Sequence, residues 1–153
     1  MVLHVATRKD AGDGGGGTGG RGNVAGSFKA TQYAAELRKA GFKEEDIAIM
    51  TAVGMRESNG NVAAHNDSNP DRERSYGLWQ INMLGGMGPE RRAKYGLTSN
   101  NQLYDPVTNA KVALDLLRNT KSGIHNWTTY TSGKFRPFYS AAAHAAGQPF
   151  SEA

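Results

Sequence analysis

Hydrophobic and polar positions follow a helical period over most of the chain beyond its N-terminal segment. Residues 27–41 carry apolar side chains at helical spacing, basic residues in the last turn and Gly41 as the terminating glycine. Residues 43–58 begin with acidic side chains, which the helix dipole favours, and the apolar pattern stops at Asn59 and Gly60. The pattern therefore predicts two consecutive helices.

The pattern changes after the second of these helices. Residues 61–75 are rich in Asn, Asp and Ser and cannot build a core, which predicts a surface loop or a small irregular hairpin. Residues 76–83, "YGLWQINM", form a short apolar run that fits either a strand or a buried helical turn.

Three further segments predict helices. Residues 88–96, "GPERRAKYG", begin with Gly-Pro and end with Gly, which is typical of a short helix. Residues 104–120 give the strongest pattern, with Asp105 as N-cap, Pro106 at the first helical position and a buried side formed by Val112, Leu116 and Leu117. The aromatic and then alanine-rich segment 126–146 predicts a loop followed by a helix. The chain is therefore predicted to be mainly α.

The N-terminal part differs in composition. Residues 11–22, "AGDGGGGTGGRG", are of low complexity and predict a flexible linker or tail, with a domain boundary near Gly26. The glycines match a dinucleotide-loop pattern by composition alone, since no strand precedes them and no helix follows directly. We therefore expect a tail over residues 1–26 and one catalytic domain over residues 27–153.

Composition narrows the function classes. The chain of 153 residues has no Cys and four dispersed His, so we expect no disulfide, no metal site and no cofactor. No apolar stretch is long enough to span a membrane, and the N-terminus has no signal-peptide pattern. The net charge of +4 favours an anionic partner, and nucleic acid, anionic lipid and bacterial cell wall all qualify. Because the Gly/Arg segment fits a linker better, no nucleic-acid partner is predicted.

Glu57 occupies an unusual position on the second predicted helix. With about 100° of rotation per residue, Val53 lies one turn before it and Met50 two turns before it, so Glu57 continues the apolar stripe. Burial and the negative end of the helix dipole both disfavour the ionised form and should raise its pKa. A carboxylic acid that stays protonated near neutral pH suits general-acid catalysis. On the helix pattern alone, a frayed helix end with Glu57 turned to water is the favoured alternative.

The segment that follows Glu57 favours the catalytic interpretation over the frayed helix end. "ESNGNVAAHNDSNPDRERSYGLWQIN" resembles the active-site stretch of the lysozyme superfamily, in which a Glu-Ser pair closes a helix and a polar loop leads to a Gly-Leu-x-Gln-Ile segment. "NWTTYTSGKFRPFY" resembles the aromatic segment that ends phage-type and soluble lytic transglycosylase-like domains. The resemblance covers residues 30–140 and implies an α+β lysozyme-like fold, with a small irregular β lobe flanking an active-site cleft.

This resemblance implies a peptidoglycan-degrading glycosidase that cleaves the β-1,4 bond between N-acetylmuramic acid and N-acetylglucosamine. Glu57 would protonate the glycosidic oxygen as the bond breaks. The matched motifs also imply substrate-binding residues, which contribute amides, aromatic faces or a cleft-lining hydroxyl: Ser75, Tyr76, Gln80, Asn82 and Tyr130.

The chain departs from animal-type lysozymes, which carry an Asp where this sequence has Ser75. Asp67, Asp71 and Glu73 could substitute from the polar loop, although solvated charges explain them better. A lytic transglycosylase needs no second carboxylate, because the C6 hydroxyl of muramic acid attacks C1 and gives a 1,6-anhydro product. The lytic transglycosylase is therefore the favoured hypothesis. Two alternatives remain: a goose-type-like hydrolase that positions a water, and a non-catalytic peptidoglycan-binding module.

The biological setting follows from the resemblance and the composition together. A wall-degrading domain without a signal peptide or Cys, behind a Gly-rich tail, fits a phage endolysin delivered by a holin or a part of a larger virion protein. We expect the domain to be a monomer that acts on peptidoglycan in the cell wall. The tail could also be the junction left by excising the domain from a longer polypeptide.

Overall fold

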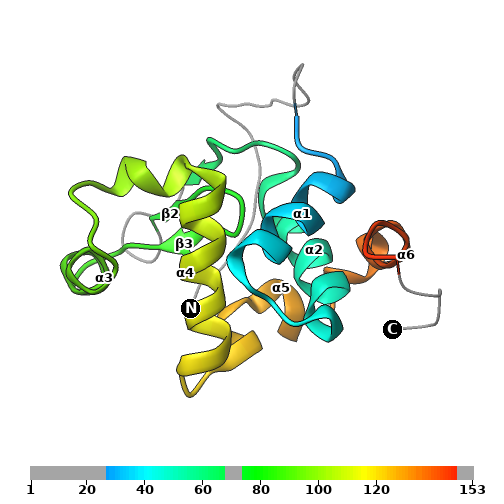
Figure 1. The fold of residues 1–153 in the computed structure, drawn as a ribbon. Helices are drawn as coiled ribbons and strands as arrows, with labels where there is room; N and C mark the ends of the chain where they lie inside the picture. Colours follow the sequence, from blue (N-terminus) through cyan, green and yellow to red (C-terminus); the bar gives the residue numbers. More distant parts are fainter. Residues whose placement is uncertain (1–26, 68–73, 148–153) are drawn as a thin grey trace.

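The computed structural model describes residues 27–67 and 74–147, and within them the chain is mainly helical with one small sheet (Figure 1). The elements in order are α1 (Ala30–Ala40), α2 (Glu44–Ser58), β1 (His65–Asn66), β2 (Ser75–Tyr76), β3 (Ile81–Asn82), α3 (Met87–Tyr95), the 3-10 helix η1 (Asn100–Tyr104), α4 (Pro106–Asn119), the 3-10 helix η2 (Gly123–Asn126), α5 (Thr128–Thr131) and α6 (Arg136–Ala145).

The predicted helices are confirmed, and their ends have the predicted chemistry. α1 stops at Gly41, whose φ of 103° is the left-handed conformation that glycine adopts without a steric penalty. α4 is capped by the Asp105 side chain, which accepts a hydrogen bond from the Thr108 backbone N–H, with Pro106 at the first helical turn. α3 begins at Met87, slightly ahead of the predicted start, so Pro89 lies inside its first turn.

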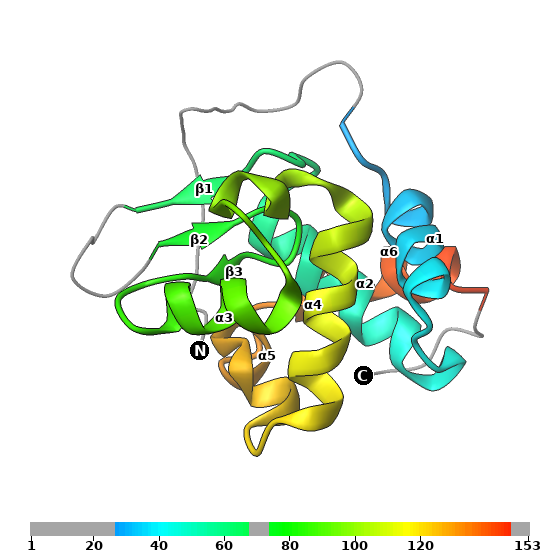
Figure 2. The same cartoon turned by 60° about the vertical axis from the view of Figure 1, so that its left-hand side comes forward.

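The irregular region between α2 and α3 forms the sheet. β1, β2 and β3 are antiparallel in that order, with His65 opposite Tyr76 and Ser75 opposite Asn82. The ambiguous run 76–83 thus supplies the end of β2, a turn and β3. Figure 2 shows the sheet and α3 on one side of the molecule and α1 and α6 on the other, with α2 and α4 between them. The predicted α+β arrangement, a helical body with a small β lobe, is confirmed.

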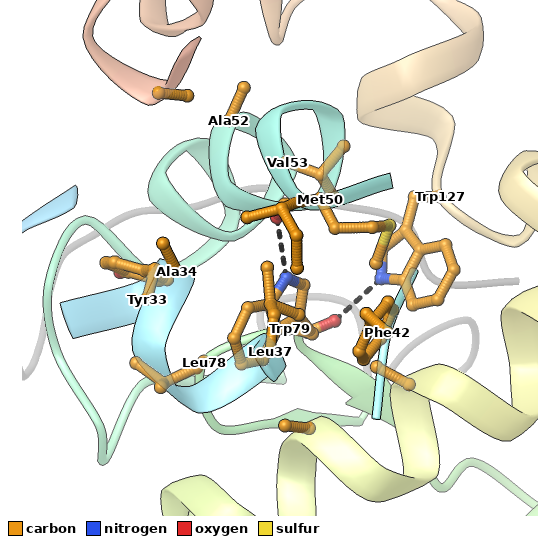
Figure 3. Close-up of a cluster of buried hydrophobic side chains, with 14 of the residues drawn as sticks. Tyr33, Ala34, Leu37, Phe42, Met50, Ala52, Val53, Leu78, Trp79 and Trp127 are labelled. Atoms are coloured by element: carbon orange, nitrogen blue, oxygen red, sulfur yellow. Dashed lines mark hydrogen bonds between the residues drawn. The ribbon is translucent and has the colours of Figure 1, made fainter. Parts of the chain in front are cut away.

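Trp79 joins the β lobe to the helical body. Its indole N–H donates to the Met50 carbonyl of α2 at 2.8 Å, and its own carbonyl accepts from the Trp127 indole at 2.8 Å (Figure 3). α2 approaches this indole through Gly54, where an added Cβ would lie 2.8 Å from Trp79 Nε1. The core around it is continuous and includes Tyr33, Leu37, Ile47, Val53, Leu78, Ile81, Leu103 and Leu116.

The structure tests one further expectation from the sequence and leaves a second one untested. None of the helices in residues 27–67 and 74–147 combines the length and the apolar character needed to cross a membrane. The predicted tail, residues 1–26, lies outside the described residues, so the predicted domain boundary stays a prediction.

Candidate active site

Glu57 lies in the last turn of α2 and is buried. Only 2% of the residue is exposed, beside the fully buried Val53 and Met50 of the same helix. Each of its carboxyl oxygens exposes less than 1 Å² and has no hydrogen-bond partner. The predicted placement of Glu57 on the apolar stripe is therefore confirmed, and the frayed, solvated helix end does not occur.

Burial changes the acidity of this carboxyl. Loss of hydration raises the pKa of Glu57 from 4.5 to about 8, while a side-chain interaction with Thr129 of α5 and the charge of Arg56 act in the lowering direction. The Thr129 contact does not meet hydrogen-bond geometry at either carboxyl oxygen, and burial is the largest of the three effects on the pKa. The group is thus mostly protonated at neutral pH and can donate a proton.

Thr129 is the residue beside Glu57 that sequence reasoning missed. It is 4% exposed and belongs to the short helix α5, immediately before Tyr130. The aromatic segment that resembles transglycosylase-like domains contains it, but a threonine in a Thr-rich run gives no signal of its own. Its place next to the carboxyl follows from the packing of α5 on α2, which no local pattern predicts.

Gln80 closes the turn between β2 and β3. Its backbone has a φ of 48°, a left-handed conformation that costs energy in a residue with a side chain. The side chain offsets this cost, because its Nε2 donates to the carbonyls of Ala64 at 3.0 Å and Gly77 at 2.9 Å. Gln80 is 1% exposed, so its amide is held rigidly inside the lobe.

Hydrogen bonds connect this turn to the end of α2. Ala64, which accepts from Gln80, donates through its N–H to Asn61, and Asn61 in turn donates to the carbonyl of Ser58. Ser58 directly follows Glu57. These hydrogen bonds therefore link Gln80 to Ser58, the residue after Glu57, and a shared role of Gln80 and Glu57 in substrate binding stays a prediction.

Ser75 and Asn82 lie opposite each other in the sheet and are both buried, at 0% and 2% exposure. The Asn82 side-chain oxygen accepts from the backbone N–H groups of Arg74 at 3.3 Å and Leu84 at 3.0 Å. These contacts give Asn82 a role in shaping the lobe. Contact of Ser75 or Asn82 with a substrate stays a prediction.

The two predicted tyrosines are half-buried in separate aromatic clusters. The Tyr76 ring lies 4.4 Å from the His65 ring and 5.7 Å from the Tyr104 ring, so His65 covers one of its faces. The Tyr130 ring stacks on the buried Phe135 at 5.3 Å with an interplanar angle of 19°. Each tyrosine is therefore packed against neighbouring rings, and its contact with a sugar stays a prediction.

The sequence leaves open which residue, if any, supplies a second carboxylate. Among the described residues, Glu57 is the only acidic residue that is buried. Asp67 has a side chain 58% exposed and pairs with His65 Nε2 at 3.6 Å. Asp71 and Glu73 lie outside the described residues. The same part of the chain holds no group of three His, Asp or Glu side chains able to bind a metal ion.

One of three comparisons with known proteins identifies a family for this chain. No curated protein and no solved structure gives a significant match to the chain. A model of a family described as lysozyme-like domain matches residues 34–129, a range that contains Glu57, the β lobe and Thr129. By this match the chain belongs to the family of lysozyme-like domains, which are generally enzymes that act on peptidoglycan.

Proposed function

We propose that the chain is a lytic transglycosylase that cleaves the β-1,4 bond between N-acetylmuramic acid and N-acetylglucosamine, with Glu57 as general acid and then general base. The observation that carries the proposal is the buried, unpartnered carboxyl of Glu57, whose pKa burial raises to about 8. A carboxylic acid in this state can give its proton to a leaving oxygen at neutral pH.

The reaction needs one group that acts twice. Glu57 first protonates the glycosidic oxygen, the bond from that oxygen to C1 of the muramic acid breaks, and an oxocarbenium-like centre develops at C1. The resulting carboxylate then takes the proton of the C6 hydroxyl while O6 bonds to C1, which closes the 1,6-anhydro ring. Glu57 ends protonated again, so the cycle needs neither a water nor a second carboxylate.

The absence of a second buried acid among the described residues supports this order of events over a retaining hydrolase. A retaining glycosidase places a second carboxyl about 5 Å from the acid to act as nucleophile. Ser75, where animal-type lysozymes carry Asp, has no charge and lies fully buried in the middle strand. Delivery by a phage particle or a holin stays a prediction from the sequence.

The glycan must reach an acid that is closed off in this structure. A general acid has to come within about 3 Å of the oxygen that it protonates. Because each Glu57 oxygen exposes less than 1 Å², the substrate has to displace the groups that cover it. We infer that binding and the exclusion of water occur together at this site.

The test compares Glu57→Gln with Glu45→Gln, a change of the same kind at an exposed position of the first turn of α2. Purified peptidoglycan is digested by each protein, and the soluble sugars are analysed by mass spectrometry. We expect 1,6-anhydro products from the wild type and Glu45→Gln and none from Glu57→Gln. Reducing-end products would identify a hydrolase instead, and binding of the wild type to the wall without any soluble product would identify a binding module.

A further inference from the structure

A continuous chain of hydrogen bonds holds the end of α2. The Gly60 N–H donates to the Tyr33 hydroxyl at 2.7 Å, this hydroxyl lies 2.6 Å from Ser58 Oγ, and Ser58 Oγ donates to the Gly54 carbonyl at 2.9 Å. Because the single hydroxyl proton of Ser58 goes to Gly54, Tyr33 is the donor in the middle bond. The two hydroxyl groups in this series of hydrogen bonds each donate one bond and accept one bond, so the order of donors is fixed.

This series of hydrogen bonds holds the C-terminal turn of α2, which is the part of a helix that is least stable on its own. The last carbonyls of a helix lack intrahelical partners, and its final turn frays readily. Here α2 leaves the helical conformation at Asn59, with a φ of 49°, and at Gly60, with a φ of 83°. The Gly60 carbonyl is held as well, since it accepts from the Phe28 N–H at 2.8 Å. The anchored residues Gly54, Ser58 and Gly60 bracket Glu57 on both sides.

The position of the Glu57 carboxyl depends on this backbone. Neither carboxyl oxygen has a hydrogen-bond partner of its own, so no direct contact of that kind fixes the group. Tyr33 is 1% exposed, and its ring makes edge contacts with the rings of Phe28 at 5.8 Å and Trp79 at 5.6 Å. Packing therefore holds the phenol of Tyr33 in one position. Through its hydrogen bonds to Ser58 and Gly60, the phenol fixes the last turn of α2 relative to α1.

We propose that Tyr33 is a positioning residue for Glu57, acting through Ser58 and Gly60 to keep the carboxyl buried and in a single place. Burial raises the pKa of the Tyr33 phenol to about 12, so it keeps the proton that it donates throughout the neutral range. The catalytic consequence rests on the proposed function, whereas the structural consequence for Glu57 does not.

The test compares Tyr33→Phe with Tyr95→Phe, which removes the same hydroxyl from a tyrosine that bonds Asp115 Oδ2 at 2.6 Å between α3 and α4. The first readout is hydrogen exchange at the Gly60 amide. The second is the pKa of the Glu57 carboxyl, followed by carbon-13 NMR. We expect Tyr33→Phe to speed exchange at Gly60 by at least about tenfold and to lower the Glu57 pKa as water enters. Tyr95→Phe should change neither quantity.

Kinetics on peptidoglycan then separate positioning from general stability. A displaced acid lowers kcat by about ten- to a hundredfold while KM stays nearly constant. Rapid Gly60 exchange in the wild type, or an unchanged Glu57 pKa and kcat in Tyr33→Phe, would overturn the proposal. If the wild type cleaves nothing, the proposed function fails, and the two NMR readouts still decide the role of Tyr33. Ser58→Ala removes a hydroxyl from the same series of hydrogen bonds, and it is the variant to measure if Tyr33→Phe does not fold.

Discussion

Replacing Glu57 with Gln should stabilise the protein relative to the wild type increasingly as pH rises from 4.5, and it should remove the proposed catalytic acid. The folded state holds this carboxyl at a pKa of about 8, against 4.5 for the free group. Between these values the folded protein binds a proton that the unfolded chain has lost, so stability falls as pH rises. The favourable contribution is fully present below pH 4.5 and is lost as pH rises through about 8.

The size of this effect follows from the two pKa values. Each pH unit in the interval costs about 1.4 kcal/mol, so the whole interval corresponds to about 5 kcal/mol of unfolding free energy. That is a large part of the total stability of about 5–15 kcal/mol for a single domain. Gln has nearly the same shape and is uncharged at every pH. Any cost of burying its amide is therefore a constant offset that does not change with pH.

Urea unfolding of the wild type and Glu57→Gln, at intervals from about pH 4 to about pH 9, measures the effect directly. The difference between the two proteins cancels the titration of every other group. We expect the variant to gain about 5 kcal/mol relative to the wild type over this range, with most of the gain between pH 5 and 8. A difference that stays constant within about 1 kcal/mol would refute the assignment of a buried, proton-retaining carboxyl.

Two further substitutions test the fold around the site. Gly54→Ala should lower the free energy of unfolding by about 1–3 kcal/mol, because the new Cβ would lie 2.8 Å from the Trp79 indole. Gly86→Ala is the control, because its new Cβ would meet nothing within 4 Å, and it should leave the thermal midpoint nearly unchanged. Asp105→Ala should lower the unfolding free energy by about 1 kcal/mol through loss of the cap on the Thr108 N–H, and an unchanged urea midpoint would contradict that role.

The helices could be predicted from the sequence because their signals are local. Gly41 and Asp105 mark helix ends through the conformations and hydrogen bonds of single residues, and both act as predicted. The burial of Glu57 could be predicted for a similar reason, since the period of 3.6 residues fixes which side of α2 it occupies. Local patterns of this kind reach about one or two turns along the chain.

The surroundings of Glu57 could not be predicted, because they come from distant segments. Tyr33 approaches the end of α2 across 25 positions of sequence, and the Trp79 indole reaches Met50 across 29. Both side chains would also suit an ordinary core, and the sequence gives no sign that their polar atoms meet particular backbone groups. Thr129 is the same case, since only the packing of α5 brings it to the carboxyl.

The burial that makes Glu57 an acid also makes it a strong base once it has lost its proton. A carboxylate whose conjugate acid has a pKa of about 8 binds a proton far more tightly than a free carboxylate, whose value is 4.5. In the proposed reaction, such a group has a strong tendency to recover a proton after it has protonated the leaving oxygen, and the C6 hydroxyl of the same sugar can supply that proton. An exposed glutamate would make a weaker acid catalyst at neutral pH and a weaker base in the second step. The dry surroundings of Glu57 therefore favour one residue serving both steps, which is the arrangement that the proposed transglycosylase mechanism uses.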